Sequence, residues 1–216
     1  MLTITAVMQH ARGMETTQDS ILDLARDCGL IRPLDLATRG LPRVSLTRLV
    51  RQGRLARVGR GLYALPDRPV SEHSTLAEVA RRHPRAVVCL LSALRFHDIT
   101  TQAPFEVWIA IPNKARAPRL DYPPMRILWF PEIALTEGVA EHLIDGVPVR
   151  ITGVARTVAD CFKYRNKVGL DVALEALREA LGTNGRGRRA TMDDLWHFAR
   201  LCRVANVMRP YMESLT

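Results

Sequence analysis

The sequence predicts an α+β protein, with an N-terminal domain of short helices and one hairpin followed by a mixed α/β domain. Two observations lead to this prediction. Short amphipathic segments separated by Gly and Pro dominate the N-terminal third, whereas the remainder alternates helix-like stretches with runs of aromatic and β-branched residues. Hydrophobic residues make up 47% and charged residues 25% of the 216-residue chain, which is typical of a globular protein.

The N-terminal domain is predicted to be a winged helix-turn-helix. Thr17 caps a first helix that Gly29 ends, and Pro33 suits the first turn of a second helix. A third helix follows a turn at Gly40-Leu41-Pro42, and a tight hairpin then turns at Gly59-Arg60-Gly61. The chain is therefore expected to comprise a flexible arm (1–16), the winged helix-turn-helix (17–68) and an α/β domain (69–216).

The expected α/β domain opens with two helices, reads as strands in its middle and closes with helices. Its strand-like runs are aromatic, β-branched and bounded by prolines, and Asp145-Gly146 between apolar flanks indicates a hairpin. Thr191, with Asp193 and Asp194 in the first turn, marks the start of a last helix. The other expected elements are helices over 73–83, 87–97, 153–163 and 168–181 and strands over 105–111 and 125–130.

Positive charge is concentrated in one block of the N-terminal domain. Between Arg39 and Arg60 the chain has seven arginines and no carboxylate, within a protein of net charge +9. The pattern is helical, because Leu46, Leu49 and Val50 have the spacing of a buried stripe. A short basic helix followed by a basic hairpin is typical of a recognition helix and its wing, and therefore predicts binding to duplex DNA.

The exposed side chains of this block are candidates for direct DNA contact. Arg48 and Arg51 lie opposite the apolar stripe and are expected to pair with guanine, with Ser45 and Thr47 on the flanks of the exposed face. Arg57 and Arg60 on the wing are expected to hold phosphates or the minor groove. The alternatives are a solvated basic face or a winged helix that serves protein contacts.

Catalytic and metal-binding patterns are weak in this sequence. The six histidines stand alone, without a second ligand at i+3 or i+4, and no Walker loop, G-x-S-x-G or GxGxxG occurs. A nuclease needs clustered acids and a lysine, but Asp98 and Glu106 are followed by Trp108 where a lysine is expected. We therefore expect no enzyme activity, metal or cofactor. The alternative is a nuclease or nucleotidyltransferase in the C-terminal domain.

Cysteine usage and hydropathy predict a cytoplasmic protein. The four cysteines (Cys28, Cys89, Cys161, Cys202) are far apart and in apolar or helical contexts, which favours free buried thiols in a reducing compartment. The longest apolar run, 86–94, is too short to span a bilayer, and the N-terminus lacks the features of a secretion signal.

A second charged segment, RTVADCFKYRNKVG (156–169), allows two interpretations. Arg156, Lys163, Arg165 and Lys167 surround Asp160, with Tyr164 among them, which is compatible with a partner or nucleic-acid surface. Alternatively, the apolar residues between them belong to the core and the charges form a solvated helix end.

Three stretches together resemble a known family: RLARVGRGLYALP, LLSALRFHDITTQAPFEVWIAIP and ARTVADCFKYRNKVGLDVALEAL. From about residue 17 to the C-terminus the chain is similar to AbiEi-type antitoxins, the transcriptional regulators of type IV toxin–antitoxin systems. The resemblance implies a winged helix that binds promoter inverted repeats and represses its own operon. It also implies a C-terminal antitoxin domain that opposes a nucleotidyltransferase-like toxin without a stable complex. A stand-alone regulator is the remaining alternative.

The resemblance also assigns roles to residues. It places DNA binding on Arg43, Ser45, Thr47, Arg48, Arg51, Arg57 and Arg60. Antitoxicity or partner binding is assigned, from charge and family position together, to Arg156, Asp160, Lys163, Tyr164, Arg165 and Lys167.

Overall fold

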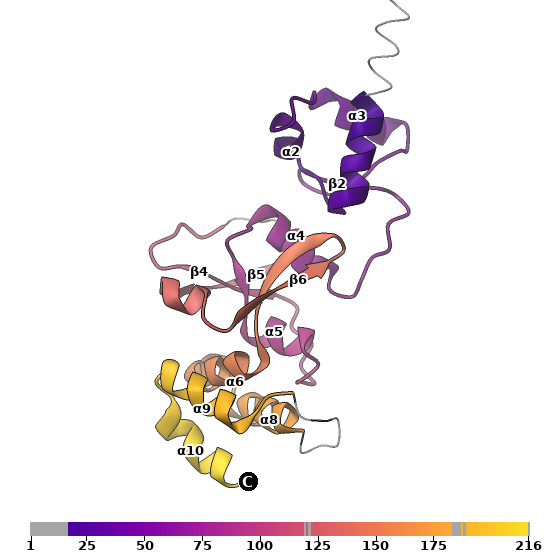
Figure 1. Ribbon diagram of the computed structural model, residues 1–216. Coiled ribbons are helices and arrows are strands. Elements are labelled where there is room, and N and C mark those ends of the chain that lie inside the picture. The colour runs from indigo at the N-terminus through magenta and orange to yellow at the C-terminus, as the bar shows by residue number, and fades with distance from the viewer. Residues whose placement is uncertain (1–16, 119, 121, 183–186, 188, 216) are drawn as a thin grey trace, which may run out of the picture. The chain divides into compact units, whose positions relative to one another are not determined.

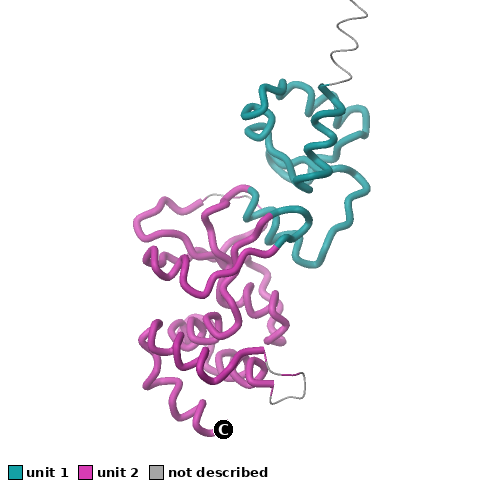
Figure 2. Tube along the Cα trace, viewed as in Figure 1, with its two compact units in different colours: residues 1–81, 143–147 teal, residues 82–142, 148–216 magenta. Residues whose placement is uncertain are grey.

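The computed structural model describes residues 17–118, 120, 122–182, 187 and 189–215. The predicted arm, 1–16, lies outside the described residues. Two compact units are present (Figure 2): Met1–Arg81 with Leu143–Val147, and Arg82–His142 with Pro148–Thr216. The predicted domain boundary between residues 68 and 69 stays a prediction.

The first unit contains the three helices and the hairpin expected from the sequence (Figure 1). A helix over residues 17–28 is followed by α2 (Pro33–Ala37) and α3 (Val44–Arg51). The antiparallel strands β1 (Ala56–Gly59) and β2 (Leu62–Ala64) then form the hairpin, which we call the wing. Aliphatic side chains from these elements form one buried cluster: Ile21, Leu22, Leu24, Ala25, Ile31, Leu36, Leu46, Leu49 and Leu55. Helix α4 (Ser74–Arg82) follows the wing, as expected for 73–83.

A five-stranded mixed sheet has the strand order β5-β4-β3-β7-β6. Strand β4 pairs parallel with β5, while β3 pairs antiparallel with β4 and parallel with β7. The predicted strands at 105–111 and 125–130 and the hairpin at Asp145-Gly146 are confirmed. The strand bounds are β3 (Val87–Val88), β4 (Val107–Pro112), β5 (Met125–Phe130), β6 (Val139–Ile144) and β7 (Val147–Thr152).

The single helix expected over 87–97 is wrong at its start. Val87 and Val88 form β3, which lies between β4 and β7, and helix α5 begins only at Leu90 and ends at Phe96. Both valines are fully or almost fully buried. Because a short apolar run fits a buried strand as well as a buried helix, the sequence alone did not separate the two.

Helices at the C-terminal end complete the second unit (Figure 1). Helix α6 packs against α5, α8 and α9, and these helices share one apolar core with strands β3 to β5. The expected helices over 153–163, 168–181 and after Thr191 are confirmed, whereas α7 and α10 were not predicted. Among the described residues no helix is both long and apolar enough to cross a membrane. The bounds are η1 (Glu132–Leu135), α6 (Val154–Lys163), α7 (Arg165–Val168), α8 (Leu170–Leu181), α9 (Met192–Leu201) and α10 (Ala205–Glu213).

Candidate nucleic-acid interface

Helix α3 has one buried and one exposed face. Leu46 and Leu49 are 2% and 0% exposed and anchor the helix in the core of the first unit. Four exposed residues lie at i, i+3, i+4 and i+7 spacing and therefore share the opposite face. We call this set the exposed α3 stripe: Val44, Thr47, Arg48 and Arg51.

The prediction that Ser45 flanks the exposed face is wrong. Ser45 is only 7% exposed, and its backbone N–H donates to Pro42 O at 3.1 Å in the turn that starts the helix. At 100° per residue, position 45 is one residue before Leu46 and four before Leu49, so it faces the core with them. A short polar side chain fits there beside the aliphatic residues. Ser45 is therefore removed from the candidate DNA contacts.

The N-terminal end of α3 favours negatively charged ligands. Arg43 is exposed at the N-cap position, and the first turn contains no acidic residue. The backbone N–H groups at a helix N-terminus carry partial positive charge, which Asp or Glu usually offsets there. Within the described part of the chain, Arg43 and Arg51 form no ion pair, so both guanidinium groups are available to a phosphate or a base.

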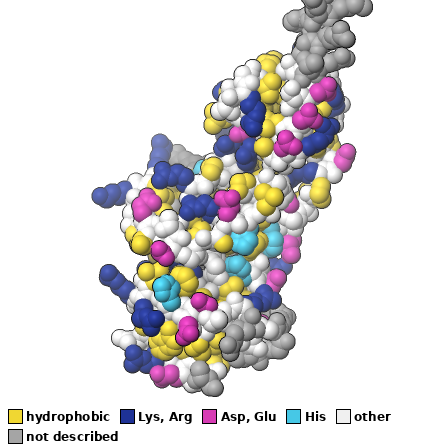
Figure 3. Space-filling view, viewed as in Figure 1, with side chains coloured by type: hydrophobic (Ala, Val, Ile, Leu, Met, Phe, Trp, Pro, Cys, Tyr) yellow, Lys and Arg dark blue, Asp and Glu magenta, His cyan; other side chains and the backbone are white. Residues whose placement is uncertain are grey.

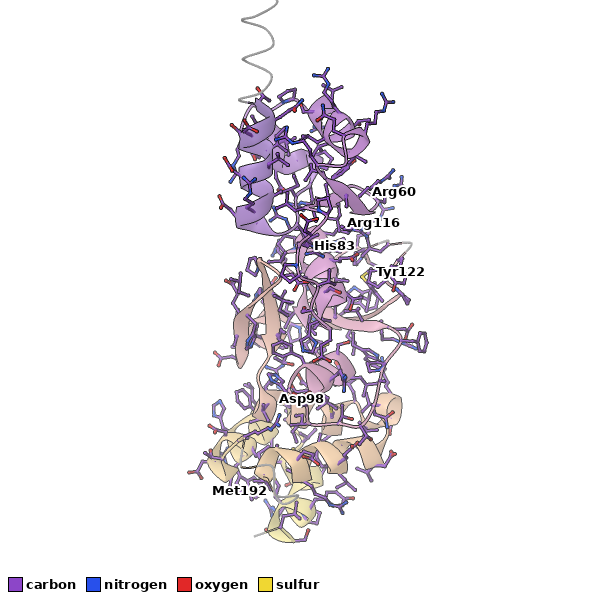
Figure 4. All side chains as sticks on the ribbon, turned by 90° about the vertical axis from the view of Figure 1, so that its right-hand side faces the viewer. Arg60, His83, Asp98, Arg116, Tyr122 and Met192 are labelled. Carbon is purple, nitrogen blue, oxygen red and sulfur yellow. The ribbon has the colours of Figure 1, made fainter. Side chains whose placement is uncertain are left out.

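The wing presents the next basic side chains. Arg57 and Arg60 are exposed, and Figure 4 shows Arg60 on the hairpin. The register between the strands shifts at Arg57 and Gly59, which makes a bulge, and Arg57 Nε donates to Gly59 O at 3.4 Å. Gly61 has φ +69°, a left-handed conformation that a side chain rarely adopts, so the tight turn requires glycine. The turn therefore fixes the position from which Arg60 extends.

Not every arginine of the block belongs to this surface. Arg54 Nη2 pairs with Asp19 at 3.0 Å and Arg54 Nη1 donates to Gln18 Oε1 at 3.1 Å, so this side chain ties α3's C-terminal turn to the first helix. On the face drawn in Figure 3, acidic side chains lie beside basic ones over this unit. The basic candidate surface is thus limited to α3 and the wing and does not include Arg54.

The prediction of a partner or nucleic-acid surface over 156–169 is wrong in part, because the ion pair at its centre is buried. The side chains of Arg156 and Asp160 are 3% and 1% exposed, and Arg156 Nε lies 3.0 Å from Asp160 Oδ2. Arg156 also donates to Glu137 O at 2.7 Å and to Ala134 O at 3.3 Å. These contacts join α6 to the segment around η1. Neither side chain is accessible to a partner.

Burial controls the chemistry around this ion pair. Burial raises the pKa of Asp160, and the neighbouring Arg156 guanidinium opposes that shift. Cys202 Sγ donates to Asp160 Oδ1 at 3.3 Å, and burial raises the pKa of this thiol to about 12. A thiol that stays protonated at neutral pH is a weak nucleophile. Arg156, Asp160 and Cys202 therefore connect α6 to the end of α9 and have a structural role.

The remaining residues of the segment lie nearer to solvent. Lys163 and Lys167 are exposed, and their Nζ atoms lie 6.0 and 5.7 Å from the centre of the Tyr164 ring. Tyr164 is half-buried and stacks on Phe130 with ring centres 5.6 Å apart. Arg165 is half-buried and donates to Phe162 O at 3.0 Å. Lys163, Tyr164 and Lys167 thus form an accessible group, with two cations beside one aromatic ring.

The acids considered for a nuclease have other roles in the fold. Glu106 pairs with Arg126, whose Nε lies 3.0 Å from Glu106 Oε2. Asp98 has φ +52° in the turn after α5, and Figure 4 labels it there. In the described ranges, no group of three or more His, Cys, Asp or Glu side chains is arranged to hold a metal ion.

Comparison with protein families agrees with the class of protein that this surface suggests. Residues 19–66 match the family model described as "Transcriptional regulator, AbiEi antitoxin". The match confirms the predicted resemblance over this stretch, which includes α2, the exposed α3 stripe and the wing. Over this stretch the chain is similar to transcriptional regulators of the AbiEi antitoxin type. From residue 67 to the C-terminus the resemblance stays a prediction.

A solved structure extends the likeness in fold to most of the chain. The crystal structure of the RV2827C protein from Mycobacterium tuberculosis superposes with a TM-score of 0.55 at 16% sequence identity. The match covers 93% of this chain and 80% of that one. At this identity the likeness concerns the fold, and it agrees with the predicted α+β class. A comparison with curated proteins found no match.

Proposed function

We propose that this protein is a sequence-specific DNA-binding regulator that represses its own operon and acts as the antitoxin of a type IV toxin–antitoxin system. One observation carries the proposal: the exposed α3 stripe and the wing together present four exposed arginines, Arg48, Arg51, Arg57 and Arg60. A helix of this kind fits the major groove of B-DNA, where side chains reach the base edges. The match of residues 19–66 to AbiEi antitoxin regulators supports the proposal.

The proposed contacts divide into two kinds. Arg48 and Arg51 on the exposed α3 stripe read guanine edges, and Thr47 contacts a base or a phosphate. Arg43 at the N-cap of α3 and the wing residues Arg57 and Arg60 hold the phosphate backbone, which positions the helix without reading sequence. Two copies of the chain on an inverted repeat then supply two such helices.

DNA binding is tested with the purified chain by fluorescence anisotropy. The DNA duplex from upstream of its own gene is compared with a scrambled duplex at low and near-physiological salt. The proposal predicts tighter binding to the native duplex that persists at the higher salt concentration. Equal binding to both duplexes that disappears with salt would reduce the basic surface to a general affinity for polyanions.

Two substitutions separate base reading from phosphate contact. Arg48→Ala is expected to weaken binding to the native duplex by about 1–3 kcal/mol and leave binding to the scrambled duplex nearly unchanged. Arg60→Ala is expected to weaken both and to lower the salt slope by about one unit. Arg26→Ala is the matched control, because Arg26 is exposed but pairs with Asp23 on the first helix. Equal losses from all three variants would refute the assignment.

The antitoxin part of the proposal involves a nucleotidyltransferase-like toxin and no stable complex, and the protein itself catalyses no reaction. Support comes from the family match and from the accessible group Lys163, Tyr164 and Lys167. Growth is measured while the toxin encoded in the same operon is expressed with and without this chain. Rescue without co-elution on a sizing column is expected. Failure to rescue would refute antitoxicity, and a co-eluting complex would refute the type IV assignment.

A further inference from the structure

One residue of the exposed α3 stripe is apolar, although most of its surface is exposed. Val44 is 68% exposed, at the first position of α3. It shares its face with Thr47 and Arg48, at i+3 and i+4, and faces away from the core. The sequence pattern does not single out Val44, because it is neither polar nor charged.

Folding does not explain a valine at this position. An exposed helix position favours Ala, Glu, Lys or Arg, since a β-branched side chain loses rotamer freedom in a helix. The first turn of a helix also favours Asp or Glu. Val44 satisfies neither preference, and its apolar surface remains in water in the free protein. A binding partner with an apolar feature at this point removes that surface from water.

The position coincides with the part of a recognition helix that approaches bases. In helix-turn-helix proteins the N-terminal residues of that helix contact base edges in the major groove. There the thymine 5-methyl group is the apolar feature among hydrogen-bond donors and acceptors. Arg48, one turn further on the same face, reaches a neighbouring base pair. The adjacent Arg43 holds a phosphate and keeps this end of the helix against the groove.

We propose that Val44 reads a thymine by contact of its methyl groups with the thymine 5-methyl group, so that each half-site contains a T·A pair next to the base pair read by Arg48. This inference rests on the proposed DNA-binding function and specifies one base of the recognised sequence. Val44 is thereby a specificity-determining residue.

Replacement of thymine by deoxyuridine tests the contact, because uracil pairs like thymine and lacks only the methyl group. Duplexes are first selected from a random pool by the purified full chain. Each thymine of the selected site is then replaced singly, and binding is measured by anisotropy. The wild-type protein is expected to bind about three- to fourfold more weakly at one thymine of each half-site, the factor for one buried methyl-sized group. Every other replacement is expected to have a smaller effect.

Three variants connect the effect to Val44. Val44→Ala is expected to bind the thymine and uracil duplexes equally, whereas Val44→Thr retains a methyl group and the discrimination. Leu34→Ala is the matched control, since Leu34 is 55% exposed on α2 and outside the stripe. Discrimination that persists in Val44→Ala, or is absent from the wild-type protein at every thymine, overturns the inference and leaves DNA binding intact. Failure to select any duplex overturns both.

Discussion

Removal of the Asp160 carboxylate is expected to destabilise the second unit strongly. The Arg156 side chain is 3% exposed, and in Asp160→Ala its remaining acceptors among the described residues are the carbonyl oxygens of Glu137 and Ala134. Removing one partner of a buried ion pair typically costs about 3–5 kcal/mol, because the other charge remains without compensation. Against a total stability of about 5–15 kcal/mol for a domain, this is a large fraction.

Tryptophan fluorescence during urea unfolding measures this loss where it occurs. All three tryptophans (Trp108, Trp129, Trp196) belong to the second unit, so the signal is insensitive to unfolding of the first. A lower midpoint at unchanged slope is the expected result. Asp160→Asn keeps one acceptor oxygen and is expected to cost less than the alanine variant.

Lys163→Ala is the matched control for this prediction. Lys163 is an exposed charge on the same helix, and within the described residues it forms no ion pair. Its removal is expected to change stability by no more than about 0.5 kcal/mol. If both variants shifted the midpoint by the same small amount, the interpretation of Arg156 and Asp160 as structural residues would be refuted.

Two further predictions concern titratable groups. Ellman's reagent is expected to label only the half-buried Cys28 in the native protein, because burial raises the pKa of the thiols of Cys89, Cys161 and Cys202. Rapid labelling of all four cysteines in the native protein would refute this prediction. Burial lowers the pKa of His97, whose Nε2 lies 2.7 Å from Thr152 O. The unfolded chain therefore binds the proton on this histidine more tightly than the folded chain, and the free energy of unfolding decreases as the pH falls below about 6.5. In urea unfolding, the stability of the wild-type protein is therefore expected to decrease from pH 7.5 to pH 5.5, and that of His97→Gln to decrease less. An equal decrease in the two proteins would contradict the role of His97 in this pH dependence.

Local signals made most of the secondary structure predictable. The strand at 125–130 was predicted to its exact bounds because β-branched and aromatic residues are confined there between prolines. Thr191 Oγ1 accepts from Asp194 N at 3.1 Å, as its N-cap role requires. The wing and the hairpin at Asp145-Gly146 were predictable because glycine marks each turn.

Long-range contacts decided the features that the sequence did not reveal. Two residues became strand β3 because β4 and β7 flank them. Arg156 and Asp160 have the i, i+4 spacing of an ordinary surface pair, and only the packing of η1 and the end of α9 over α6 buries them. Helix α10 contains Pro210 within its span, where proline usually ends a helix.

In the candidate interface, too, the sequence predicted the position of some single residues and not of others. Arg48 and Arg51 were assigned correctly to the exposed face because arginine is rarely buried and the apolar stripe fixed the helical phase. Ser45 was assigned to the exposed face and Val44 was given no role, since polarity was taken to mean exposure. Helical phase places Ser45 inward and Val44 outward whatever their polarity. Arginines at an interface fit any polyanion, whereas the proposed contact of Val44 with a thymine methyl group depends on base sequence. The deoxyuridine experiment on Val44 therefore tests whether α3 reads sequence or is merely basic.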